Sequence, residues 1–335
     1  MKATPAAVGP ARAPPSCHRA RTPRRPQHVC AATGQTQTAL LPGGGAIAIP
    51  KTREARRDLA FLVREVVQDD CYLKRPDGTK TAKIKGGVVL DVGANVGVFS
   101  MHAVSRGARR VIAVEPAPQT YACLVENAAA VANDRITHVR AAVGNPDEGA
   151  TTVTLTWYPK CSGWASIRPR PDDEVTQDVE SYAAALAGES AGESGVADIA
   201  GGPLALGLLR LLAPFPALLR LVVRVRVRRM LSHAIKEEVK FVSLAQLIQD
   251  HIGGDEPIAL VKVDVEGAEM DVLRGITPET WPRIHAVVCE THGGAAEAER
   301  VAAELRTAHF DDVSIHNCGG GMEGTQLRMV YAWRV

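Results

Sequence analysis

The chain of 335 residues is 46% apolar and 23% charged, the ordinary balance of a soluble globular protein with room for a sizeable core. Its formal net charge of +2 is unevenly distributed, because residues 1–53 contain no Asp or Glu but hold eight Lys or Arg. The rest of the chain is therefore mildly acidic. This argues against a general nucleic-acid-binding surface, which needs cations that neutralise phosphates.

The basic N-terminal segment, residues 1–35, is rich in Arg, Pro, Ala and Thr and has no apolar run long enough for a secretory signal. This composition predicts a disordered organelle transit peptide. Small residues around Cys30 are typical of a chloroplast processing site, so we expect a chloroplast location, with the mitochondrion as the alternative. A disordered basic tail, or a start codon assigned too early, would account for the same composition.

Residues 36–83 are expected to form a linker and an N-terminal helix. The stretch ALLPGGGAIAIP, residues 39–50, is typical of a glycine-rich linker. Between Thr52 and Asp70, apolar residues such as Leu59 and Val66 recur with helical spacing and predict a helix with one apolar face. The remainder, residues 84–335, predicts a single domain.

Along that domain, short apolar strands that end near an acid alternate with helices. The predicted strands lie within residues 88–90, 108–116, 136–144, 258–267 and 285–294, and two more close the chain. Strands and helices of these lengths in alternation predict an α/β fold with a parallel sheet and right-handed crossovers.

Two segments interrupt this alternation. Residues 151–169 predict a small β-excursion over the edge where the strands end. Residues 171–222 predict an insertion, which is partly disordered over residues 171–202 because large apolar side chains are scarce there. The apolar stretch that follows is interrupted by Arg210, Arg220 and two prolines, which argue against a membrane span. It predicts two short helices that form a lid, with peripheral membrane contact through residues 203–229 as the alternative.

The segment VVLDVGANVGVFS, residues 88–100, joins a buried strand to a glycine loop that opens a helix. Such a loop is typical of nucleotide-like ligands, because glycine allows close backbone approach and the helix start offers free N–H groups. Here Asp91 occupies the position of the first glycine of the dinucleotide motif GxGxxG, and Gly93, Asn95 and Gly97 follow. A carboxylate suits a cation better than a pyrophosphate, so the loop favours S-adenosylmethionine over NAD. A tight turn without any ligand is the alternative.

Glu115 ends the second strand and is expected to accept hydrogen bonds from both ribose hydroxyls, although a solvated acid at a strand end is the simpler interpretation. With these segments, the strings LVKVDVEGAEMDVLRG and VVCETHG make the chain resemble the FkbM family of methyltransferases over residues 84–170 and 220–335. The resemblance implies S-adenosylmethionine as methyl donor. It also implies a Rossmann-like class I methyltransferase fold, with a mostly parallel seven-stranded sheet and helices on both faces.

The resemblance assigns roles to individual residues. Asp91, Gly93, Asn95 and Gly97 would line the methionine part of the donor, Glu115 would hold the ribose, Ala142 and Val143 would border the adenine, and Lys262, Asp264 and Glu266 would face the methyl group. Asp264 is our first candidate for the general base and His292 the second. A helix cap at Asp264, an ordinary loop histidine at His292 and an ion-paired Lys262 remain the simpler alternatives.

The expected reaction is in-line transfer of a methyl group to a hydroxyl of a small molecule or a sugar. Five cysteines outside the leader show no paired or His-flanked spacing, so no metal site is expected. No nucleic-acid partner is expected either, and nothing indicates the oligomeric state. The alternatives are an NAD(P)-dependent oxidoreductase and a non-catalytic protein that binds the donor or a partner.

Overall fold

The computed structural model describes residues 36–41, 45–131, 134–146, 149–188, 200–318, 322 and 324–334, and the predicted transit peptide lies outside them. The strands are β1 (Thr36–Leu40), β2 (Ala46–Pro50), β3 (Val88–Val92), β4 (Arg110–Val114), β5 (Ile136–Val139), β6 (Ala142–Gly144), β7 (Thr152–Tyr158), β8 (Cys161–Ser166), β9 (Ile235–Ser243), β10 (Ile258–Val263), β11 (Ala286–Thr291), β12 (Asp312–Asn317) and β13 (Arg328–Trp333). The helices are α1 (Ala55–Val63), the π-helix η1 (Arg64–Gln68), α2 (Val98–Ser105), α3 (Pro118–Ala130), α4 (Asp172–Gly188), α6 (Pro203–Leu212), α7 (Pro216–Leu231), α8 (Leu244–His251), α9 (Glu269–Arg274), the 3-10 helix η3 (Trp281–Arg283) and α10 (Gly294–Thr307).

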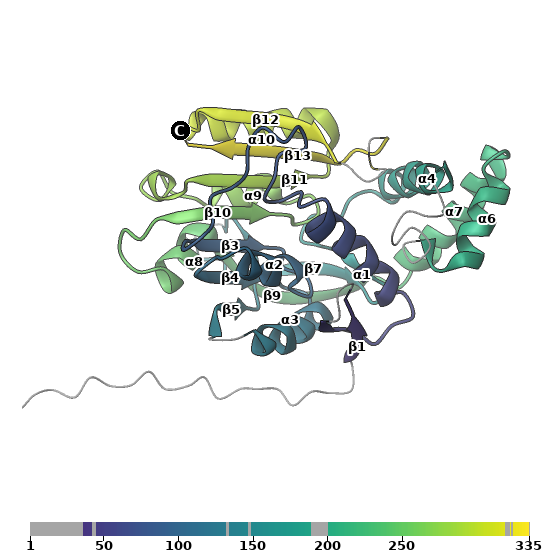
Figure 1. Cartoon of the computed structure of the whole chain (residues 1–335), viewed down its shortest axis with the longest axis horizontal. Helices are drawn as coiled ribbons and strands as arrows, with labels where there is room; N and C mark the ends of the chain where they lie inside the picture. The colour runs from purple at the N-terminus through teal and green to yellow at the C-terminus, as the bar shows by residue number, and fades with distance from the viewer. Residues whose placement is uncertain are drawn as a thin grey trace, which may run out of the picture. The chain divides into compact units, whose positions relative to one another are not determined.

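The central sheet has seven strands in the order β12-β13-β11-β10-β3-β4-β5 (Figure 1). Neighbours from β11 through β10, β3 and β4 to β5 are parallel, whereas β13 runs antiparallel to both β11 and β12. The predicted α/β fold with a mostly parallel seven-stranded sheet is confirmed. The strand order reverses between β3 and β10, and open α/β sheets bind ligands at the carboxyl ends of strands at such a point.

Helices cover both faces of this sheet, as predicted, because its strands are apolar on both sides. Along β3, Val89 packs into one hydrophobic cluster with Phe99 of α2 and Leu124 of α3. The adjacent Leu90 packs into the other, which includes Ile248 of α8. The carboxyl end of the sheet is thereby left as the edge at which polar side chains collect.

The predicted β-excursion is present and larger than expected. Strands β7 and β8 join β9 and β6 in a second sheet of four strands, in the order β6-β9-β7-β8. The single strand predicted over residues 136–144 is split between the two sheets, since β5 pairs with β4 and β6 pairs with β9. This split turns Ala142 and Val143 toward the carboxyl edge of the central sheet.

The predicted linker at residues 39–50 is instead part of a β-hairpin formed by β1 and β2. The alternation of Ile47 and Ile49 with alanines buries both isoleucines, and the side chain of Asn127 on α3 bonds the backbone of Ala48. The helix predicted between Thr52 and Asp70 is found as α1 continued by η1.

The insertion also differs from expectation. Helix α4 spans 17 residues where the sequence predicts partial disorder, because small side chains suffice to pack Val175 and Ala183 against α7. The two short helices predicted after it are α6 and α7, and α7 continues past residue 222 to Leu231. Figure 1 shows α4, α6 and α7 together at one side of the central sheet.

Candidate active site

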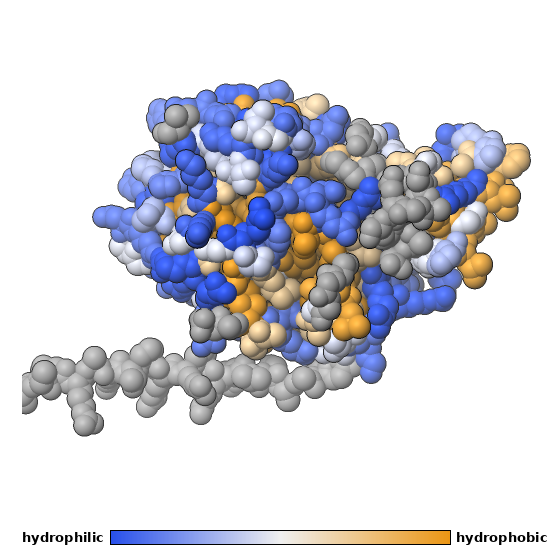
Figure 2. All heavy atoms as spheres, viewed as in Figure 1, coloured by the Kyte–Doolittle hydropathy of each residue, from blue (hydrophilic) through white to orange (hydrophobic). Residues whose placement is uncertain are grey.

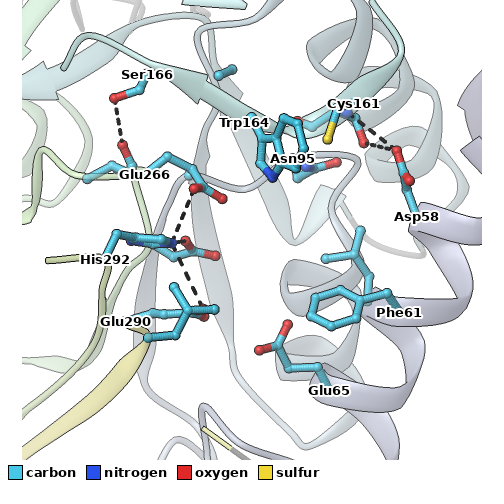
Figure 3. A pocket seen from close by; sticks show the side chains of 18 of the residues that line it. Asp58, Phe61, Glu65, Asn95, Cys161, Trp164, Ser166, Glu266, Glu290 and His292 are labelled. Carbon is cyan, nitrogen blue, oxygen red and sulfur yellow. Dashed lines mark hydrogen bonds and ion pairs between the residues drawn. The ribbon is translucent and has the colours of Figure 1, made fainter. Parts of the chain in front are cut away.

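A cavity of about 360 Å³ lies at the carboxyl ends of β3, β4, β10 and β11, and this volume is within the range of small-molecule sites. Its floor comes from these strand ends, and its other walls come from α1, η1, β8, α4 and α7. The polar residues of its lining include Arg57, Asp58, Glu65, Tyr72, Asn95, Glu115, Ser162, Ser166, Arg170, Asp178, Tyr182, Arg226, Lys262, Asp264, Glu266, Glu290, His292 and Thr325. Figure 3 shows Glu266, His292 and Glu290 facing Glu65 and Phe61 across this space.

The glycine loop lies where the ends of two strands, β3 and β10, come close together. Gly93, Asn95 and Gly97 all have positive φ angles, of 81°, 50° and 91°, which side chains other than those of Gly and Asn rarely adopt. A Cβ atom at Gly93 would overlap the backbone carbonyl of Asp264, so glycine is required for β3 and β10 to end side by side. Gly93 and Asn95 line the cavity, whereas Gly97 begins α2 behind it.

Asp91 is fully buried beneath the loop and does not line the cavity. Its Oδ2 atom accepts a hydrogen bond from the hydroxyl of Ser100 at 2.6 Å, and its Oδ1 atom lies 3.3 Å from Nζ of Lys262. The carboxylate that the sequence places beside a cationic ligand therefore faces a cation of the chain itself.

Lys262 links the two strand ends. Its Nζ atom donates a hydrogen bond to the backbone oxygen of Gly93 at 2.7 Å and lies 3.4 Å from Oδ2 of Asp264. Burial lowers the pKa of this amine, but the Asp264 and Asp91 carboxylates outweigh burial and raise the pKa above its usual value. Lys262 is thus a charged group held between two acids, consistent with the simpler alternative of an ion-paired lysine.

Glu115 holds the glycine loop from the end of β4. Its Oε2 atom accepts the backbone N–H of Asn95, while Oε1 accepts the N–H of Ala117 and the hydroxyl of Thr120. Burial raises the pKa of Glu115, although these three hydrogen bonds act in the opposite direction. A ribose bound in the cavity would meet a carboxylate that is already fixed in place.

Acids that follow β10, and Glu290 near the end of β11, converge on His292. Its Nδ1 atom lies 2.8 Å from Oε1 of Glu269, which is fully buried. Its Nε2 atom lies 3.3 Å from Oε2 of Glu266, 3.9 Å from Oδ1 of Asp264 and 4.0 Å from Oε1 of Glu290. Asp264, Glu266 and His292 each offer one ligand atom, and these three atoms lie within 4.8 Å of one another, close enough to share a metal ion.

Tyr72 and Glu65 also belong to this cluster, and sequence reasoning missed both. The hydroxyl of Tyr72 lies 3.0 Å from Oδ2 of Asp264 and 2.7 Å from Oε2 of Glu290, although it has one proton to donate. Glu65 reaches the cavity from η1 (Figure 3). No local motif marks either residue, since their roles depend on how the N-terminal helix lies across the sheet.

The carboxyl groups of Glu266 and Glu290, which lie near each other in the cavity lining, bind protons more tightly than usual. Burial raises the pKa of Glu266 to about 8, although the neighbouring His292 lowers it. Burial and then the Asp264 carboxylate raise the pKa of Glu290 to about 7. Burial would lower the pKa of His292, but the carboxylates of Glu266 and Glu269 raise it well above its usual value. Groups that titrate near neutral pH are suited to proton transfer.

The structure therefore brings together most of the residues proposed from the sequence. Gly93, Asn95, Glu115, Ala142, Val143, Lys262, Asp264, Glu266 and His292 line one cavity, whereas Asp91 and Gly97 support its loop from behind. Of the two tryptophans in the β-excursion, Trp164 lines the cavity and Trp157 does not.

Comparisons with known proteins indicate the family of the chain. A family model described as "Methyltransferase FkbM domain" matches residues 91–318. The chain is 30% identical over 299 residues to the 31-O-demethyl-FK506 methyltransferase FkbM of Streptomyces tacrolimicus, covering 89% of this chain and 97% of that one. It is 25% identical over 259 residues to methyltransferase sdnD of Sordaria araneosa, covering 75% and 82% of the two chains.

Among solved structures, methyltransferase FkbM of Methylobacillus flagellatus is similar with a TM-score of 0.37 and 13% identity, over 81% of this chain and 52% of that one. The TYW2 protein of M. jannaschii, solved in complex with AdoMet, is similar with a TM-score of 0.39 and 10% identity, over 90% and 87%. The family model covers more than half of the chain, and its range includes the strand ends that form the cavity. This chain belongs to the FkbM family of methyltransferases.

Proposed function

We propose that the protein uses S-adenosylmethionine to methylate a hydroxyl oxygen of a small molecule or a sugar. The observation that carries the proposal is a single cavity that joins the glycine loop, Glu115 and a wall of carboxylates. The residues fit this donor, since the loop offers backbone groups, Ala142 and Val143 offer an apolar edge for a base, and the acid wall suits its cationic end. The Streptomyces relative, whose name places its action at a 31-O position, supports oxygen as the acceptor atom.

The donor supplies an activated methyl group when it is bound. The protein's own tasks are to orient the acceptor, exclude water and take the hydroxyl proton. Asp264 remains the first candidate for the base, because its Oδ1 atom faces the cavity while Tyr72 and Lys262 hold Oδ2. His292 remains the second candidate, although the surrounding carboxylates favour its charged form, which cannot accept a proton.

The test is transfer of an isotopically labelled methyl group to a panel of alcohols, sugars, phenols and amines. We expect label in hydroxyl-bearing compounds and much slower labelling after Asp264→Asn, with donor affinity retained. Label in amines alone would contradict the proposed acceptor chemistry. Donor binding without transfer to any compound would support the non-catalytic alternative.

A chloroplast location, with residues 1–35 as the transit peptide, is also proposed from composition. Import of the full chain into isolated chloroplasts, with loss of the leader, is the expected outcome. Import into mitochondria instead would favour the alternative.

A further inference from the structure

We propose that Asp264, Glu266 and His292 bind one divalent first-row metal ion, such as Mn²⁺ or Zn²⁺, on the floor of the cavity. The residues come from the ends of two neighbouring strands, since Asp264 and Glu266 follow β10 and His292 follows β11. Binding of the ion does not depend on the proposed methyl transfer, whereas its role in selecting the acceptor rests on that proposed function.

Two of the three donor residues, Asp264 and His292, have one atom held by the protein and one atom that faces the other donors. For Asp264, Oδ2 is held by Tyr72 at 3.0 Å while Oδ1 faces the imidazole. For His292, Nδ1 is held by Glu269 at 2.8 Å while Nε2 faces both carboxylates. A histidine that binds metal through one ring nitrogen almost always has the other fixed in this way, commonly by a carboxylate.

The spacings from the imidazole to the two carboxylates fit one ion. Bonds from a first-row divalent ion to nitrogen or oxygen are roughly 2.0–2.2 Å, so two donors on the same ion lie up to about 4.4 Å apart. Nε2 of His292 lies 3.3 Å from Glu266 Oε2 and 3.9 Å from Asp264 Oδ1. Oε1 of Glu290, at 4.0 Å from Nε2, is near enough to act as a further or water-mediated ligand.

The charge at the site also calls for a cation. Five carboxyl groups, from Glu65, Asp264, Glu266, Glu269 and Glu290, lie around His292 and Lys262. Lys262 is turned toward Asp91 and the Gly93 carbonyl, and Arg170, the other cation near Glu266, is paired with Asp178. One imidazole with two carboxylates suits transition ions better than Ca²⁺ or Mg²⁺, which prefer oxygen alone.

The ion would select the acceptor. Three protein donors leave open positions on the metal, as in catalytic sites generally. Those positions suit an acceptor with two adjacent oxygens, such as a vicinal diol or a 2-hydroxy acid. With Asp264 on the ion, Glu290 would replace Asp264 as the base: the bound hydroxyl would lose its proton to Glu290, its oxygen would bond the methyl carbon, and the carbon–sulfur bond would break with its electron pair on sulfur.

The test is titration of the metal-depleted full chain with Mn²⁺, followed by the electron paramagnetic resonance signal of free Mn²⁺. We expect one Mn²⁺ per chain, displaced by Zn²⁺ but not by equal Ca²⁺. Glu266→Gln and His292→Ala should abolish it, and Glu269→Gln should weaken it by about 10- to 100-fold, as orienting partners of metal-bound histidines do. Glu237→Gln and His251→Ala, which replace the same residue types outside the cavity, should bind like the wild type.

The proposed metal site would be overturned if the wild type bound Mn²⁺ or Zn²⁺ no more tightly than Glu266→Gln does. In that case His292 would be only a charged partner of Glu266. Glu266→Gln is nearly isosteric, so melting temperatures can verify that it folds even if His292→Ala does not. Donor binding in excess chelator is measured in parallel. Donor binding without metal binding refutes only this inference, and metal binding without donor binding refutes only the proposed function.

A second inference concerns the outward surface of α6 and α7, which Figure 2 shows as an apolar edge of the molecule. Seven large side chains there are well exposed: Leu204, Leu208, Leu211, Phe215, Leu218, Leu221 and Val225. On α7, the buried positions Leu219, Val223 and Val227 face the cavity side, so the exposed residues occupy the opposite face. Residues 203–229 hold six arginines and no acid.

We infer that this surface docks on an anionic membrane. None of the helices in the described ranges is long and apolar enough to cross a bilayer. An amphipathic helix with an apolar face and arginines beside it lies in the membrane interface, where anionic headgroups neutralise the cations. The same helix closes the cavity, so docking would bring the cavity close to acceptors dissolved in the membrane.

Co-sedimentation with vesicles tests this docking. We expect binding to vesicles of phosphatidylcholine with phosphatidylglycerol, weaker binding to phosphatidylcholine alone, and weaker binding at high salt. Replacing Leu211 and Leu221 by Ser should lower the partition coefficient by about 10-fold or more for each leucine. Leu40→Ser, at a leucine that is 74% exposed on β1, is the matched control. Equal sedimentation of the wild type and the double variant would overturn the inference. So would a dimer in solution that the double variant disrupts, since a second copy would then cover the surface.

Discussion

The floor and the roof of the cavity are built in opposite ways. The floor consists of polar groups at the ends of β3, β4, β10 and β11, fixed by hydrogen bonds and ion pairs to one another. The roof is mainly apolar, with side chains such as Val223 and Val227, although Asp178 of α4 and Arg226 of α7 also line the cavity. The difference indicates where chemistry and specificity reside, because the clustered carboxyl groups and His292 lie in the floor, while the roof mainly shapes the space above them.

The largest expected effect is on the floor, at Asp264. Asp264→Asn keeps the shape of the side chain and removes the proposed base, so the rate of methyl transfer should fall by about 10²- to 10⁴-fold. Donor affinity, measured by calorimetry, should change little. Wild-type turnover in this variant would show that Asp264 is not the base. It would also contradict the assignment of the chemistry to the floor of the cavity.

Gly93→Ala should separate the two strand ends on which the floor rests. A Cβ at this position meets the carbonyl of Asp264, and φ is positive as well. Gly86 also has a positive φ, but no atom lies within 4 Å of its Cβ position. Gly86→Ala should therefore lose about 1–2 kcal/mol of unfolding free energy from backbone conformation alone. Gly93→Ala should lose clearly more in denaturant titrations, and equal losses would show that the close approach does not matter.

Glu115→Ala should weaken the binding of S-adenosylmethionine and leave the roof intact. Hydrogen bonds to a charged group contribute roughly 1.5–3 kcal/mol, so the dissociation constant of S-adenosylmethionine should rise by about 10- to 100-fold. Glu126→Ala, on the exposed side of α3, is a matched control. Unchanged donor affinity after Glu115→Ala would place the ribose elsewhere.

The smallest effect is expected in the roof. Val227→Ala removes two buried methyl groups and should cost about 1.5 kcal/mol of unfolding free energy, at about 0.8 per methylene-sized group. It should raise the KM for the acceptor while kcat changes little. Val225→Ala, at an exposed position of the same helix, should leave both the stability and the KM unchanged. A fall in kcat with unchanged KM would mean that the roof takes part in the chemistry.

The floor was largely predictable from the sequence because its residues lie in short motifs at strand ends. The parallel sheet brings Asp91, Glu115 and Asp264 to one edge whatever the loops do. What the motif could not show is the direction of each side chain. Asp91 turns down to Ser100 and Lys262, since its position in the buried strand leaves no path to the cavity.

The roof and the N-terminal wall were much less predictable. Tyr72 and Glu65 reach the acid wall only because α1 and η1 cross the end of the sheet, and no local pattern encodes that crossing. The hairpin at residues 36–50 and helix α4 were missed for a related reason, since glycine and small residues hide elements that tertiary packing stabilises.

The central claim is that the polar floor is a site for S-adenosylmethionine. Calorimetric titration of the full chain with S-adenosylmethionine, and in parallel with NADH, tests it most directly. We predict one site of micromolar affinity for S-adenosylmethionine, weakened in Glu115→Ala, and no measurable binding of NADH. A folded wild-type protein that binds NADH or neither compound would contradict it.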